Sequence, residues 1–238
     1  MPRLGIHLDG VAVLRESGQA TEPDPVAVAI LAEMGGADQI SIHLRQDRAH
    51  IQDRDANLLK SVIRTRLNLH VSLSEAMVAA VLALNPDIVT LVPEKEPELT
   101  LHSGLDVIQH SELIADRLKT LRGNRTICLF IDPELDQIKT AHKLGVDGVA
   151  LNVSDYAGSF TLDEYATEIE RLATAAAMAS RLGLMVTLEN GVDYQNIHNL
   201  LGLEGVHGVI AGHAVIARAM LVGMERAVQE LAQWVKRP

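Results

Sequence analysis

The chain alternates between short apolar runs rich in β-branched residues and longer stretches with helical periodicity. The short runs predict eight strands: Leu4–Leu8, Gln39–His43, Leu67–Val71, Ile88–Val92, Thr126–Ile131, Gly148–Asn152, Met185–Leu188 and Gly208–Ala211. The periodic stretches predict helices at Pro25–Met34, Ala56–Thr65, Ser74–Leu84, Leu105–Leu121, Leu135–Leu144, Leu162–Leu182, Tyr194–Leu200 and Ala214–Lys236. Repeated strand and helix units of this number predict an α/β fold, a (β/α)8 TIM barrel that forms a single domain over residues 1–238.

An open, doubly wound parallel sheet is the competing architecture. Such a sheet usually carries a Gly-x-Gly-x-x-Gly turn after its first strand, and Gly5 and Gly10 do not form that pattern. No Pro/Gly/Ser-rich linker or block of like charge divides the chain. The closed barrel is therefore the simpler prediction.

Composition narrows the classes of protein. The chain is 47% hydrophobic but only 3% aromatic, so Val, Ile, Leu and Ala must build its core. Its formal net charge of −10 argues against a general nucleic-acid binder. The single cysteine, Cys128, lies in an apolar run and suits a buried thiol in a reducing compartment. No apolar run reaches membrane-spanning length, so we expect a cytoplasmic protein with no membrane partner.

Polar residues concentrate where the predicted strands end. In a TIM barrel these ends and the loops after them form the active face. The candidates are His7, Asp9, His43, Arg45, His50, His70, Thr100, Asn190, Gly191, Gly212 and His213. Any one of them, taken alone, is more typical of a helix cap or loop anchor. Their convergence on one face predicts a pocket for small phosphorylated substrates.

Two segments sharpen that prediction. Gly212 and His213 lie at the start of the last predicted helix, where free backbone N–H groups can bind an anion. Gly191, after the seventh strand, would face this helix start. The alternative is that Gly212 only permits the turn. Arg45 could bind a phosphate or a polyol, and His43 could transfer a proton near neutral pH. The alternative there is a basic surface loop balanced by neighbouring aspartates.

A family resemblance is carried by eight stretches of the chain: Ala12–Arg15, Glu22–Pro25, His43–Ile51, Asp53–Asp55, Leu91–Lys95, Gly104–Val107, Leu129–Asp132 and Gly212–Ala214. Through them the chain resembles the pyridoxine 5′-phosphate synthase family of vitamin B6 biosynthesis. The resemblance implies condensation of 3-amino-2-oxopropyl phosphate with 1-deoxy-D-xylulose 5-phosphate, without a cofactor. It also implies a homo-octamer.

The resemblance assigns roles to the candidates. It implies catalytic positions at His43, His70 and Asn190. Substrate-binding positions fall at His7, Asp9, Arg45, His50, Thr100, Gly191, Gly212 and His213. The chain departs from the family with His7 for Asn, Gly10 for His, Gly18 for Arg, His70 for Glu, Ala150 for Glu and Asn190 for His.

These departures change the expected acid/base chemistry. His70 can still act as a base because imidazole titrates near neutral pH. Asn190 can only form hydrogen bonds, so the proton donor of the family is lost there. Glu189 is the adjacent carboxyl, but in a continuing strand it points to the side opposite Asn190.

Other functions stay open at this stage. The chain could be a diverged paralogue that acts on a different phosphorylated sugar or ketone. His7, His43 and His70 could hold a catalytic zinc ion, although three separate hydrogen-bonding histidines and no metal is the simpler interpretation. A non-catalytic protein that binds a phosphorylated metabolite is the last alternative.

Overall fold

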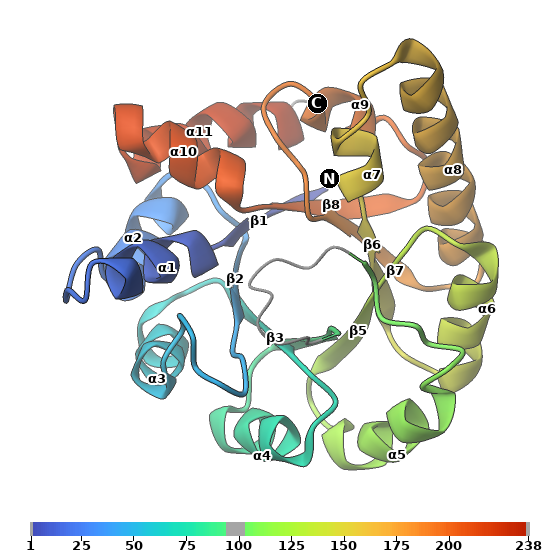
Figure 1. The fold of residues 1–238 in the computed structure, drawn as a ribbon, viewed down its shortest axis with the longest axis horizontal. Coiled ribbons are helices and arrows are strands. Elements are labelled where there is room, and N and C mark those ends of the chain that lie inside the picture. Colours follow the sequence, from blue (N-terminus) through green and yellow to red (C-terminus); the bar gives the residue numbers. More distant parts are fainter. Residues whose placement is uncertain (1, 94–102, 237–238) are drawn as a thin grey trace.

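Eight parallel strands close into a barrel in which each strand pairs with the next and β1 pairs with β8 (Figure 1). The structure is a computed structural model that describes residues 2–93 and 103–236. The strands are β1 Arg3–His7, β2 Gln39–His43, β3 Arg66–Val71, β4 Ile88–Leu91, β5 Thr126–Ile131, β6 Gly148–Asn152, β7 Met185–Glu189 and β8 Val206–Ala211. This arrangement confirms the predicted (β/α)8 barrel, and each strand lies within two residues of its predicted bounds.

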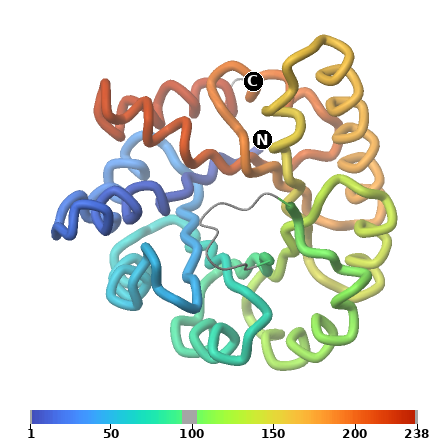
Figure 2. Tube along the Cα trace, viewed as in Figure 1, coloured from blue at the N-terminus to red at the C-terminus, as the bar shows by residue number. Residues whose placement is uncertain are grey.

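Helices form the outer ring around the strands, as the chain trace shows (Figure 2). They are α1 Asp9–Ser17, α2 Pro25–Met34, α3 Asp53–Val62, α4 Glu75–Leu84, α5 Ser111–Leu121, α6 Leu135–Leu144, α7 Ser154–Ala157, α8 Leu162–Arg181, α9 Ile197–Leu201, α10 His213–Val222 and α11 Met224–Val235. None of these helices in the described part of the chain is long and apolar enough to cross a bilayer.

Several helical predictions were wrong in detail. Helices α1 and α7 were not predicted, and α3 begins at Asp53 rather than at Ala56. The stretch Ala214–Lys236, expected as one helix, is divided between α10 and α11 at Gly223, whose φ of +83° lies in the left-handed region that glycine tolerates. The predicted helix Leu105–Leu121 begins only at Ser111, because residues 105–106 are irregular and residues 107–110 form a turn before it.

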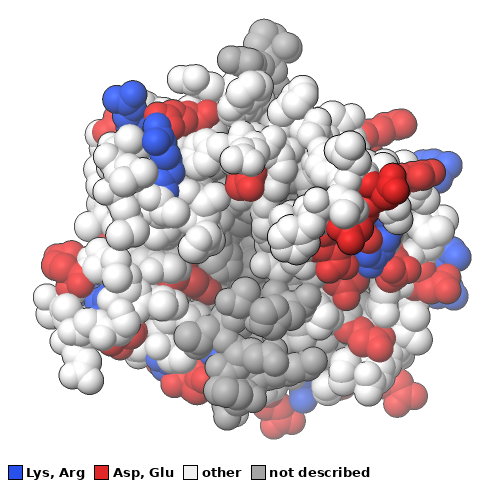
Figure 3. Space-filling model, turned by 45° about the horizontal axis from the view of Figure 1, so that its top comes forward, with Lys and Arg blue, Asp and Glu red and all other residues white. Residues whose placement is uncertain are grey.

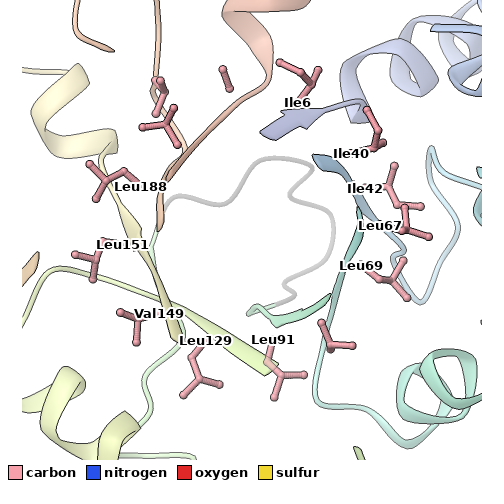
Figure 4. Packing of buried hydrophobic residues seen from close by; sticks show 14 of the residues in the cluster. Ile6, Ile40, Ile42, Leu67, Leu69, Leu91, Leu129, Val149, Leu151 and Leu188 are labelled. Atoms are coloured by element: carbon pink, nitrogen blue, oxygen red, sulfur yellow. The ribbon is translucent and has the colours of Figure 1, made fainter. Parts of the chain in front are cut away.

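The period-two alternation of the strands separates two environments. Side chains such as Ile42, Leu69 and Leu129 point outward from the strands and pack beneath the helices (Figure 4). Their neighbours along the strands therefore point inward. Phe130 and Ala150 form a separate small apolar cluster with Val92 inside the barrel. Polar side chains such as Asn68, His70 and Thr90 occupy other inward positions, so the barrel interior also holds buried polar groups.

A buried ion pair fastens α1 to the start of α3. The Arg15 guanidinium donates to both oxygens of Asp55, at 2.9 and 2.7 Å, and Asp55 is fully buried. Arg15 also donates to the carbonyl oxygen of His50 at 3.1 Å. The Gln52 N–H completes the shell of Asp55 at 3.0 Å. This pair therefore holds the loop between β2 and α3 in place.

The visible surface carries its positive charge largely in ion pairs. On the flank formed by α6 and α8, Asp and Glu side chains gather around Lys and Arg (Figure 3). Arg171 there lies 2.9 Å from Glu134, 3.2 Å from Asp155 and 2.8 Å from Glu168. The charge of Arg171 is therefore shared among three carboxylates.

Removing the carboxylate of the buried pair should destabilise the fold. In Asp55→Asn the Arg15 guanidinium loses its buried carboxylate and keeps only the exposed carboxylate of Glu16; loss of a buried partner typically costs about 3–5 kcal/mol of the free energy of unfolding. Urea denaturation measures this loss. The matched control is Asp136→Asn, an exposed carboxylate paired with Lys139, which should change stability by less than about 1 kcal/mol. Equal stability of the two variants would contradict the assignment.

Candidate active site

A histidine and a carboxylate form the fixed charge pair of the site. His7 ends β1 and Asp9 begins α1, and the Nε2 of His7 lies 2.9 Å from Oδ2 of Asp9. The other oxygen, Oδ1, accepts the backbone N–H of His43 at 2.9 Å. Burial lowers the pKa of His7, but the charge and hydrogen bond of Asp9 raise it above the usual 6.5. Burial likewise opposes ionisation of Asp9, yet His7 holds the pKa of that carboxyl well below its usual range.

His50 is held beside this pair in one tautomer. Its Nδ1 accepts the backbone N–H of Ile51 at 2.7 Å, so the proton of the neutral ring resides on Nε2. That Nε2 faces Oδ2 of Asp9 at 3.6 Å. Burial lowers the pKa of His50, and the side chain is almost completely buried. His50 therefore presents an N–H donor toward Asp9.

His43 supplies an open nitrogen. It ends β2, is only 3% exposed, and its Nε2 has no hydrogen-bond partner among the described residues. Burial is the largest cause that lowers its pKa to about 4, outweighing the attraction of Asp9. The ring is therefore neutral at pH 7. A neutral imidazole with a free nitrogen is suited to accept a proton from a bound substrate.

His70 is neutral for a different reason. It ends the inward row of β3 next to His43, with its ring edge-on to that of His7 at a centroid distance of 4.9 Å. Thr90 donates to the Asn68 Oδ1 at 2.9 Å, which directs the Asn68 amide nitrogen to His70 Nε2 at 3.1 Å. Burial lowers the pKa of His70 well below its usual value. Its Nε2 already accepts a hydrogen bond, which weakens it as a base.

Glu189, which the sequence suggested only as a doubtful replacement for the missing proton donor and a possible further metal ligand, lies in the site. It is the last residue of β7 and follows the inward row of Met185 and Thr187, which line a cavity at the opposite, amino-terminal end of the barrel. Its side chain is 5% exposed, with Oε2 lying 3.7 Å from Nε2 of His70. Burial raises the pKa of Glu189 to about 7, against the opposing attraction of His7. Counting alternate residues along β7 is the signal that would have found it.

Asn190 lies at the turn where β7 ends. Its φ of +67° takes the chain out of the strand, and its side-chain amide donates to Oδ1 of Asn152 at 3.0 Å. The following Gly191 has a φ of +128°, and a Cβ there would approach Ala157 Cβ to 2.8 Å. Asn190 is thus a hydrogen-bonding group at the rim rather than a proton donor.

Arg45 belongs to an ion-pair network and not to a free basic loop. It is 1% exposed, and its guanidinium donates to both oxygens of Asp47 at 3.0 and 2.8 Å. This pair lowers the pKa of Asp47 to about 2. Arg48 in turn donates to Asp53 at 2.9 Å. Both arginines are therefore positioned by carboxylates.

The end of the last strand, β8, brings the chain close to His7 and leads into helix α10. Gly212 follows β8, and a Cβ there would lie 3.3 Å from Cβ of His7, so a larger residue would crowd the pair. His213 is the first residue of the ten-residue helix α10. Thr100, the remaining predicted residue, lies outside the described residues.

The arrangement of donors does not suit a metal ion. Within residues 2–93 and 103–236, the one group of His, Cys, Asp or Glu side chains whose ligand atoms all lie within 4.8 Å is Asp9, His43 and His50. The predicted set of His7, His43 and His70 is not that group. Within the group of Asp9, His43 and His50, the His50 ring carries its proton on Nε2, the nitrogen that faces Asp9, so that nitrogen has no lone pair for a metal.

Comparison with known proteins identifies relatives along the whole chain. The sequence profile of the family described as "Pyridoxal phosphate biosynthesis protein PdxJ" matches residues 4–237. Proteins named pyridoxine 5′-phosphate synthase from Geotalea daltonii and Cyanothece sp. are each 43% identical over 237 residues, with 99% of both chains covered.

Solved structures share the fold at low identity. Thiamine phosphate pyrophosphorylase from Pyrococcus furiosus has a TM-score of 0.66 and 20% identity, covering 98% of this chain and 95% of that one. KGPDC from Streptococcus mutans has a TM-score of 0.69 and 12% identity, covering 100% and 98%. At these identities the similarity shows the barrel fold alone.

The charge pair gives a direct titration prediction. In Asp9→Asn the pKa of His7 should fall below 6.5, because burial then acts without the carboxylate that offsets it. NMR titration of the histidine ring protons measures this. In the wild-type protein the stabilisation by the pair is lost as pH rises through the raised pKa of His7, or falls through the lowered pKa of Asp9. Asp136→Asn is the control, and an unchanged His7 titration in Asp9→Asn would refute the pairing.

Proposed function

This chain belongs to the pyridoxal phosphate biosynthesis protein PdxJ family, and we propose from this premise that it is a pyridoxine 5′-phosphate synthase. It is an enzyme of vitamin B6 biosynthesis. The reaction condenses 3-amino-2-oxopropyl phosphate with 1-deoxy-D-xylulose 5-phosphate and releases phosphate and water. The observation that carries the proposal is the burial of His43 with an open Nε2 beside the His7–Asp9 pair, within a chain that matches the family from end to end.

The protonation states of the site suit this chemistry. Joining an amine to a ketone requires a group that accepts a proton and a fixed charge that orients polar substrates. His43 is neutral and has a free nitrogen, so it is the base. Asp9 contributes an anion at a fixed position, and its hydrogen bond with His7 favours the protonated form of that ring. Their charges need no reorganisation when the substrate becomes polar in the transition state.

Two parts of the chain bind the substrate phosphates in this proposal. The start of α10, at Gly212 and His213, presents backbone N–H groups and the positive end of a helix dipole. Gly191 lets the loop after β7 pack closely against Ala157 of α7. Arg45, held by Asp47, supplies a guanidinium at the deoxyxylulose phosphate side. Both substrates are thus held by their phosphates while their reactive carbons meet near His43.

Self-association and a cytoplasmic location extend the proposal by family resemblance. The most exposed large apolar side chains in the described part of the chain lie at two places, Phe160 and Leu162 before and at the start of α8, and Met220 and Leu221 at the end of α10. Exposed apolar groups of this size favour contact with another protein surface. A homo-oligomer, as the family implies, would cover them. No cofactor takes part in the proposed reaction.

Turnover of both substrates by the purified protein tests the function. We expect pyridoxine 5′-phosphate and inorganic phosphate to form in equal amounts, without added cofactor. Calorimetric titration of each substrate alone accompanies the assay. Binding of deoxyxylulose phosphate without product at high enzyme concentration would reject the synthase and favour a different reaction on a phosphorylated sugar.

Substituting the proposed base should slow the reaction with little effect on binding. In His43→Gln the ring nitrogen is lost while a hydrogen-bonding side chain of similar reach remains. We expect kcat to fall by about 10²–10⁴-fold, as is typical for loss of a positioned acid/base group. His142→Gln, on the outer helix α6, is the control and should keep wild-type kcat. A kcat of His43→Gln close to the control would exclude this role.

A further inference from the structure

We infer that Glu189 is a further catalytic residue, a carboxyl group at the end of β7 that exchanges protons with the substrates bound between His43, His70 and His7. The inference rests on the proposed function. It assigns a chemical role to a residue that lies on the wall of the barrel opposite β2 and β3. The argument starts from the surroundings of its carboxyl group.

The carboxyl of Glu189 is buried without a dedicated partner. Its Oε2 is inaccessible and has no hydrogen bond among the described residues. Its nearest basic group, Nε2 of His70, lies 3.7 Å away and already accepts the Asn68 amide. A buried carboxylate left in this state destabilises the protein, so a site of this kind needs a functional explanation.

Asp55 shows what a purely structural buried carboxyl looks like in the same protein. It is also inaccessible, but it accepts two hydrogen bonds from Arg15, one from Arg54 and one from the backbone of Gln52. Its pKa is lowered by these bonds although burial opposes ionisation. Glu189 differs in both respects, since it lacks such donors and its pKa is raised. The contrast separates a carboxyl built to stay charged from one able to change its charge.

The side chains around Glu189 leave its carboxyl group able to gain or lose a proton near neutral pH. His70 from β3 is neutral, and Cys128 from β5 is a neutral thiol because burial raises its pKa to about 12. His7 from β1 favours the ionised form of Glu189, and His7 is itself hydrogen-bonded to Asp9 at 2.9 Å. A pKa raised to about 7 leaves both the protonated and the ionised form of Glu189 accessible near neutral pH.

The proton transfer can be written for imine formation, where amine and ketone have added to form an amino alcohol. The protonated carboxyl of Glu189 gives its proton to the departing hydroxyl, the C–O bond breaks, and water leaves with the bonding electrons. The nitrogen lone pair forms the C=N bond. The carboxylate then takes the N–H proton of the iminium ion, which restores the acid. Atoms and charge balance, and no further reagent is needed.

Kinetics of three variants test the inference. Glu189→Gln keeps the size and hydrogen bonding of the side chain but cannot release a proton; we expect kcat to fall by about 10²–10⁴-fold with the Kd of each substrate within about threefold of wild type. Glu189→Asp, which retains a carboxyl one methylene shorter, should recover part of the rate. The control is Glu204→Gln, an exposed carboxyl in the loop before β8, and it should match wild type.

The pH profile adds a readout that a structural role would not change. Since the protonated acid starts the step, wild-type kcat should decline as pH rises through about 7, and this limb should be absent from Glu189→Gln. Infrared difference spectra should show a carboxyl band that disappears over the same pH range in wild type and is missing in the variant.

The outcomes separate the inference from the proposed function. A wild-type kcat in Glu189→Gln, or a carboxyl band that is already ionised at pH 5, overturns the inference while the synthase activity stands. A loss of rate that is matched by an equal loss of substrate binding overturns it too. Absence of turnover in wild type overturns the proposed function, and the catalytic role with it. Circular dichroism of each variant verifies that the fold is retained.

Discussion

Closure of parallel strands into a barrel sends every second side chain into a narrow interior, and the chemistry of this protein depends on what that interior does to charge. The outward row, with Ile42 and Leu129, fills the space beneath the helices. The inward row ends in His7, His43 and Glu189 at the carboxyl ends of the strands. Removal from water opposes a charge on each of them, so each group's partners decide which one stays charged.

The same burial produces three different protonation states. The pKa of His7 is raised because Asp9 lies at hydrogen-bonding distance, which favours the protonated ring. His43 has no such partner at its ring nitrogen and is neutral. Glu189 has no hydrogen-bonded cation beside it, and burial raises its pKa to about 7, so both its protonated and its ionised form are accessible. Groups whose pKa values are driven apart in this way can serve as acid and base in one reaction. No metal ion is required for this division of roles.

The sequence predicts the barrel well because local patterns of residues mark its strands and helices. Apolar runs and the glycines between them mark the strands, and period two marks the inward rows. The division of the last helix at Gly223 escapes this reasoning, since a single glycine inside a helical pattern is also compatible with an unbroken helix. The state of His70 escapes it for a deeper reason. Its hydrogen bond comes from Asn68, whose amide is oriented by Thr90 on the next strand.

Glu189 illustrates the same limit within the site. Alternation along β7 places Glu189 in the inward row with Met185 and Thr187. What the sequence does not give is the residue at which the strand ends, and so whether Asn190 continues the alternation. Register pairs Asn152 with Glu189, and the left-handed φ of Asn190 then turns the chain toward the rim. The titrating carboxyl thus comes from the strand rather than from the loop after it.

The first and second halves of the barrel contribute different groups to the site. Asp9, His43 and His50 belong to the first half, where Arg15 binds both Asp55 and the His50 carbonyl and so holds the loop that carries His50. The second half supplies the carboxyl of Glu189 and the helix start at Gly212 and His213. A substrate that spans the interior therefore meets the His7–Asp9 pair and the proposed base His43 on one wall and the proposed acid Glu189 on the other, so that a proton acceptor and a proton donor come from different strands, as successive proton transfers require.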